Sequence, residues 1–98
     1  MSLRHTYEFS IPPAHPTAAL HFPGMPIVPG ALLLDAAVVA ISAAAPLHFQ
    51  VVKFLSPMRH GEAVELSWRE GDGGIISFEM RRRGEDALVV AGTLGRVL

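Results

Sequence analysis

The alternation of apolar and polar side chains predicts a strand near the start of the chain. Over residues 5–11, Tyr7, Phe9 and Ile11 fall on one face, and polar residues fall on the other. The next segment, residues 12–30, is rich in proline and glycine, which disfavours a regular helix or strand there. A long irregular segment is uncommon in so small a domain unless it has a function. We therefore expect a functional loop between the first strand and the next element.

A helix is predicted over Ala31–Ala45, because alanine and leucine favour helix and Pro46 can end it. Apart from Asp35, this segment is apolar on every side, so we expect the helix to be surrounded by protein. It is shorter than the roughly 20 apolar residues that a membrane-spanning helix needs, and it contains a carboxylate. We therefore predict no membrane segment.

The remaining chain alternates as four strands, over residues 49–55, 64–69, 76–81 and 87–98, and the last is apolar on both faces. Gly71–Gly74 and Gly84–Asp86 mark turns between the last three strands. Short connections predict that all four form an antiparallel meander. The sequence as a whole predicts one domain, residues 1–98, of the α+β class. In it, a curved antiparallel sheet wraps around one long central helix.

Composition and charge narrow the classes of function. Half of the residues are hydrophobic, more than a domain of this size is expected to bury alone, so we predict association with a second subunit. The net charge of −1 does not favour nucleic acid as a ligand. The lack of cysteine excludes disulfides and a thiol nucleophile. Residues 1–10 show no signal peptide, and we expect a cytoplasmic protein.

One short run of basic residues, Arg81-Arg82-Arg83, has two interpretations. It is the solvated end of a hairpin, which is the commoner role of a short charged run. Alternatively, it is a landing site for an acidic carrier protein or for the phosphate of a carried cofactor. We favour the hairpin end.

Asp35 is the residue most indicative of chemistry, because an ionised carboxylate within an apolar helix is costly unless it is paired. The alternative is a first-turn carboxylate that interacts with the helix dipole. His21 opens the loop that leads to this helix, although a lone histidine is more often structural. Gly30 leaves the first N–H groups of the helix open to a ligand carbonyl. Imidazole, carboxyl and N–H donor together provide the groups for proton transfer beside a carbonyl.

The other histidines do not show the spacing typical of metal ligands on a helix, so we expect no metal site. These are His5, His15, His48 and His60. The chain also lacks a nucleophile elbow, a P-loop and a dinucleotide fingerprint.

The loop and the helix together resemble the signature of the β-hydroxyacyl-acyl carrier protein dehydratases. His21-Phe22-Pro23-Gly24 is similar to the HFPG motif of that family, and Asp35 follows His21 by fourteen positions, as the family's acid does. Pro26, Pro29-Gly30 and Leu34-Asp35-Ala36 also match. An aspartate at this position is similar to the decanoyl-type dehydratase-isomerases. The segment Phe9–Asp35 resembles above all the short dehydratase-like proteins of aryl polyene clusters.

This resemblance implies a hot-dog fold and the dehydration of a 3-hydroxyacyl thioester to a trans-2-enoyl thioester without a cofactor. It implies that His21 removes the α-proton and that Asp35, from the partner subunit's helix, protonates the departing hydroxyl. The Gly30 N–H would polarise the thioester carbonyl, and the Ile27 carbonyl would fix the tautomer of His21. The implied partners are a thioester of acyl carrier protein or coenzyme A and a second copy of the chain. The implied pathways are fatty-acid-like, polyketide or aryl polyene biosynthesis.

Two alternatives remain open. A hot-dog thioesterase also places a carboxylate on its helix, but it does not need the HFPG motif. A non-catalytic hot-dog subunit would bind an acyl chain or complete a heterodimer. It would tolerate two departures from the family, Leu20 where glycine is common and Val39 where many dehydratases have glutamine.

Overall fold

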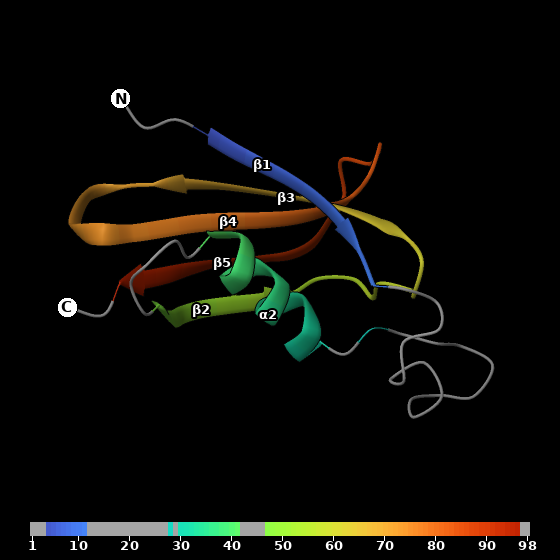
Figure 1. The fold of residues 1–98 in the computed structure, drawn as a ribbon, viewed down its shortest axis with the longest axis horizontal. Helices are drawn as coiled ribbons and strands as arrows, with labels where there is room; N and C mark the ends of the chain where they lie inside the picture. The colour runs from blue at the N-terminus through green and yellow to red at the C-terminus, as the bar shows by residue number, and fades with distance from the viewer. Residues whose placement is uncertain (1–3, 12–27, 29, 42–46, 97–98) are drawn as a thin grey trace.

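Five strands and one α-helix make up the computed structural model, which describes residues 4–11, 28, 30–41 and 47–96 (Figure 1). The predicted elements are confirmed, with boundaries that move by a few residues. Residues 42–45 of the predicted helix lie outside the described residues. In chain order the elements are β1 (Arg4–Ser10), α2 (Gly30–Ile41), β2 (Leu47–Phe54), β3 (Ala63–Glu70), a 3-10 turn (Asp72–Gly74), β4 (Ile75–Arg82) and β5 (Leu88–Arg96).

The strands form one antiparallel sheet in the order β1-β3-β4-β5-β2. Strands β3, β4 and β5 form the predicted meander. The prediction is wrong for β2, which pairs with β5 and not with β3. Alternation shows which face a side chain occupies, but it does not show which strand lies next to which.

The segment between β2 and β3 explains this order. At its start, the backbone N–H groups of Leu55 and Ser56 both donate to the Val89 carbonyl at the beginning of β5, at 2.8 and 3.4 Å. At its end, the Gly61 N–H donates to the Ile11 carbonyl just after β1, at 2.7 Å. The segment therefore crosses the end of the sheet, and β3 pairs with β1.

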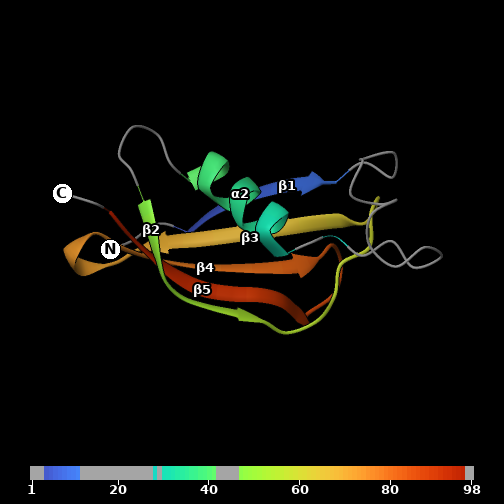
Figure 2. The ribbon, with the colours of Figure 1, turned by 90° about the horizontal axis from the view of Figure 1, so that it is seen from below.

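Helix α2 lies against one face of the sheet, which curves around it (Figure 2). Leu33, Ala37 and Ile41 on the inner side of the helix are buried among apolar side chains from the sheet. These are Val64, Leu66, Ile76, Phe78, Met80, Val89, Val90 and Leu94, with Val28 and Met58 from the adjoining segments. The buried residues of β3 and β4 are therefore mainly those that the alternation of apolar and polar positions places on one face of each strand.

The outer side of α2 is exposed. Ala31, Asp35 and Val39, spaced four residues apart, form a stripe that points away from the sheet, and Val39 is 80% exposed. The expectation that the helix is surrounded by protein is therefore wrong for the single chain, because its one sheet covers only one side of it. We call residues Ala31, Asp35 and Val39 the outer stripe.

Candidate active site

Asp35 lies at the centre of the outer stripe and is exposed in the single chain. The first turn of α2 contains no acidic residue, so Asp35 is not placed to stabilise the helix by interacting with the start of its dipole. The structure therefore argues against the structural interpretation of this carboxylate. Its neighbours on the stripe, Ala31 and Val39, are apolar, and an apolar stripe on a small protein normally faces another protein surface.

Gly30 is the first residue of α2 and borders an apolar cleft of about 410 Å³. The cleft lies between the start of the helix and the chain that leaves β2. The backbone N–H of Val28 donates to the Met58 carbonyl at 2.8 Å, which fixes the approach to the helix. The other lining residues are Leu33, Phe54, Leu55, Ser56 and Pro57. A cleft of this kind suits an apolar ligand group that lies beside the N–H groups at the start of the helix.

The ring of Phe54 lies against Gly30. A Cβ atom at Gly30 would fall 2.5 Å from Cε1 of Phe54, closer than carbon atoms approach, so a side chain at this position would displace the exposed Phe54 ring. The sequence analysis attributed the small size of Gly30 to ligand approach alone and did not include Phe54. No local signal could have identified Phe54, because the contact joins the end of β2 to the start of α2.

Asp35 is not among the residues that line this cleft, although it belongs to the same helix as Gly30. His21 and Ile27, which complete the predicted site, lie outside the described residues, as do Leu20 and His15. The structure therefore brings Gly30 and the cleft together and directs Asp35 away from both. Within the described residues, Asp35 lies on the exposed side of α2, apart from the cleft.

The basic run Arg81–Arg83 is engaged within the chain. Arg81 forms an ion pair with Glu79 at 2.6 Å, and Arg83 with Glu8 at 3.4 Å. Arg82 contacts Glu62 at 3.2 Å and Glu85 at 3.7 Å, and it also donates to the Pro57 carbonyl. These contacts neutralise the run and favour the hairpin-end interpretation over a landing site for an acidic partner.

Among the residues that the structure describes, no group of three or more His, Cys, Asp or Glu side chains is placed to hold a metal ion. No helix in the described part of the chain combines the length and the apolar character that crossing a membrane requires.

Several known structures have a fold similar to that of this chain. A chain of the dehydratase heterocomplex ApeI:P from Xenorhabdus doucetiae is similar with a TM-score of 0.74 and 19% identity, over 97% of this chain and 88% of that one. A dehydratase from type I polyketide synthases is similar with a TM-score of 0.69 and 17% identity, over 97% of this chain and 40% of that one. The fluoroacetyl-CoA thioesterase FlK is also similar, with a TM-score of 0.62 and 15% identity, over 98% of this chain and 86% of that one.

At such low identities these likenesses establish the fold alone, and that fold is the hot-dog fold that the sequence predicted. The family is shown by the sequence itself. The family model of the ApeI-like dehydratases, described as ApeI dehydratase, matches residues 2–93, so the chain belongs to the ApeI-like dehydratase family. The predicted resemblance to thioester dehydratases is confirmed. No curated protein matches the sequence.

Proposed function

We propose that this protein removes water from a 3-hydroxyacyl thioester, held on an acyl carrier protein, to give a trans-2-enoyl thioester. The pathway would be fatty-acid-like, polyketide or aryl polyene biosynthesis. The match to the ApeI-like dehydratase model over residues 2–93 carries this proposal. The HFPG motif at His21 and the carboxylate fourteen residues later support it, because they supply a base and an acid for an elimination.

In the proposed mechanism, the neutral imidazole of His21 takes the proton from C2 of the substrate. The electron pair of that C–H bond forms the C2–C3 double bond as the C3–O bond breaks. The carboxyl group of Asp35 gives a proton to the departing hydroxyl, which leaves as water. The Gly30 N–H donates to the thioester carbonyl and stabilises the negative charge that develops on its oxygen. The Ile27 carbonyl accepts a hydrogen bond from the second ring nitrogen of His21 and fixes its tautomer. No step needs a cofactor.

We infer that two copies of the chain form the active unit, with each site shared between them. The exposure of Asp35 on the outer stripe supports this inference, because the carboxylate faces away from the cleft of its own chain. The edge strand β2 supports it as well, since Val51 and Phe54 on this strand are 51% and 57% exposed. Exposed apolar side chains on an edge strand form a surface that another chain can cover.

The reaction can be tested by following both products of a 3-hydroxyacyl thioester. We expect the purified protein to form the enoyl thioester, detected by its ultraviolet absorbance, without release of free thiol. Offering the same acyl group on an acyl carrier protein and on coenzyme A distinguishes the two carriers, and we expect faster turnover with the carrier protein.

Two other outcomes would contradict the proposal. Free thiol without enoyl thioester would identify a thioesterase, the activity named for the structural neighbour FlK. Neither product, with either carrier, would identify a non-catalytic subunit that needs a different chain. In that case, adding a catalytically active hot-dog protein should restore turnover. The restored rate should be the same with the wild-type chain and with its His21→Ala variant.

A further inference from the structure

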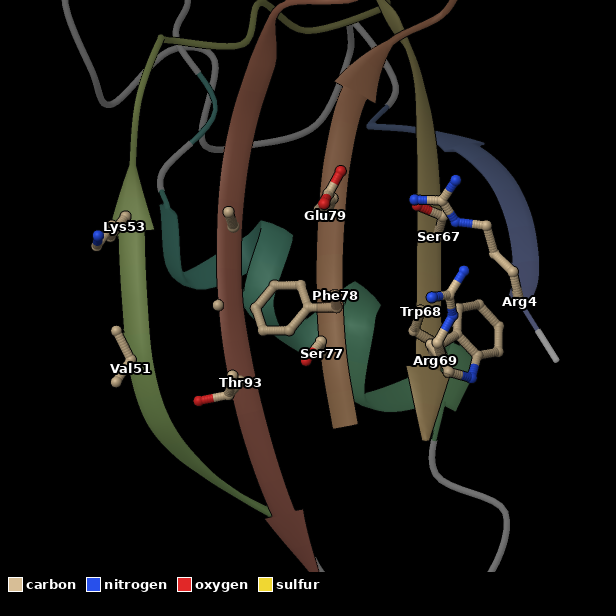
Figure 3. Close-up of a pocket in the computed structure, with 12 residues that line it drawn as sticks. Arg4, Val51, Lys53, Ser67, Trp68, Arg69, Ser77, Phe78, Glu79 and Thr93 are labelled. Atoms are coloured by element: carbon tan, nitrogen blue, oxygen red, sulfur yellow. The ribbon is translucent and has the colours of Figure 1, made fainter. Parts of the chain in front are cut away.

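The face of the sheet opposite α2 carries a second pocket, of about 490 Å³, that the proposed dehydration does not use (Figure 3). Its volume lies within the range of about 300–1,000 Å³ that is typical of small-molecule sites. Charged side chains line this pocket, whereas the described lining of the cleft at Gly30 has none. It is therefore a separate site with a different kind of ligand.

The sheet register explains why a hollow forms there. Arg69, Ser77 and Thr93 are consecutive partners across β3, β4 and β5, and Arg4 on β1 is the partner of Arg69. The small hydroxyl side chains form the floor in the middle of this row. The long Arg4 and Arg69 side chains form one wall, and Lys53 on β2 forms the opposite wall (Figure 3).

Ser67 on β3 contributes a hydroxyl group to the pocket. It is 6% exposed and is the only buried polar residue in the described part of the chain, and it lines the pocket. None of the hydrogen bonds within the described residues engages its hydroxyl group. The hydroxyl is therefore available to donate to a ligand in the pocket. In Figure 3 the Arg4 side chain extends from β1 toward Ser67.

The charge of the pocket specifies the ligand further. Arg4, Arg69 and Lys53 line it, and none of them forms an ion pair with another described residue. The one acid in the lining, Glu79, is paired with Arg81. The pocket therefore has an excess of positive charge in a chain whose net charge is −1. This charge distribution favours an anion with more than one negative charge.

We propose that this outer pocket binds a small organic phosphate. The guanidinium groups of Arg4 and Arg69 present forked donors that match phosphate oxygens, and the Ser67 hydroxyl adds a further donor. Lys53 neutralises the remaining charge from the opposite wall. A single carboxylate would occupy one guanidinium and leave the other two cations uncompensated, so phosphate is the better match.

The proposal is tested by titrating the full-length protein with inorganic pyrophosphate at constant ionic strength while its amide NMR signals are followed. We expect saturable shifts confined to residues around Ser67, Ser77 and Thr93. The double variant Arg4→Gln/Arg69→Gln should weaken binding at least about tenfold, because two charge-assisted contacts are lost. Ser67→Ala should weaken pyrophosphate binding less than the double arginine variant does, because it removes one hydroxyl donor and leaves the charge of the pocket unchanged. The matched control is Arg59→Gln/Arg83→Gln, which removes two exposed cations outside the pocket and should leave binding unchanged.

Three results would overturn the proposal. One is the absence of saturable shifts up to about 10 mM pyrophosphate, beyond the range of weak specific complexes. The second is an equal loss of binding in both double variants, which would indicate unspecific attraction. The third is a shift of the same amides with protein concentration alone, which would show that another copy of the chain covers this face.

Discussion

Replacing His21 with alanine is expected to lower the rate of enoyl thioester formation by about 10²–10⁴-fold, the range that a positioned acid or base contributes. The imidazole is the only group of the proposed site that can take the proton from C2, and alanine leaves no base in its place. The measurement is kcat/KM for dehydration, followed by the ultraviolet absorbance of the product.

The control for His21→Ala is His15→Ala. His15 lies in the same proline-rich loop and is also followed closely by proline, but the proposed mechanism gives it no role. We expect this variant to keep most of the wild-type activity. Equal losses in the two variants would show that the loop needs both histidines for its structure. Unchanged turnover in His21→Ala would remove the base from the mechanism.

Introducing lysine at Val39 and Val51 together is expected to dissociate the active unit and abolish most of its turnover. Val39 belongs to the outer stripe and Val51 to the edge strand β2, and both are exposed apolar residues in the single chain. Val51 also lines the outer pocket, so the edge that we assign to the partner borders this pocket. Lysine on an edge strand opposes pairing with another chain. The loss of two buried valines alone should raise the dissociation constant at least about a hundredfold. Analytical ultracentrifugation and the dehydration assay, run over a range of protein concentrations, measure both effects.

The matched control for this pair is Tyr7→Lys/Ile75→Lys. Tyr7 on β1 and Ile75 at the start of β4 are also exposed apolar residues, but neither lies on β2 or on the outer stripe. We expect this variant to remain associated and active. If it dissociates and the Val39/Val51 variant does not, the subunit interface lies at the other edge of the sheet.

The sequence was sufficient to predict the elements because burial on one face imposes a period that is visible in the residues. Ile76, Phe78 and Met80 alternate with polar residues, and all three are buried under α2. The neighbours of β2 were not predictable in this way. Its pairing with β5 depends on hydrogen bonds from Leu55 and Ser56 to Val89. These residues lie more than 30 positions apart in the sequence, so no local pattern shows that they meet.

For the candidate site, the sequence was most informative where a motif is local. The spacing of Asp35 from His21 and the position of Gly30 at the start of the helix were read directly from the residues. The direction in which Asp35 points was not, because an apolar helix shows no face until the sheet is placed against it. The contact of Phe54 with Gly30 and the row from Arg4 to Thr93 likewise depend on the order and register of the strands.

The central claim is that each site combines His21 of one copy with Asp35 of another, and mixing two inactive variants tests it most directly. His21→Ala and Asp35→Asn are each purified, mixed in equal amounts and allowed to exchange subunits. Random exchange pairs half of the dimers as mixed dimers, and each of these holds one site with both groups intact. The account predicts a return of activity to about a quarter of the wild-type value, starting from a much lower level in each variant alone. If both residues served the same chain, every site would lack one of them, and a mixture that remains as inactive as its components would contradict the account.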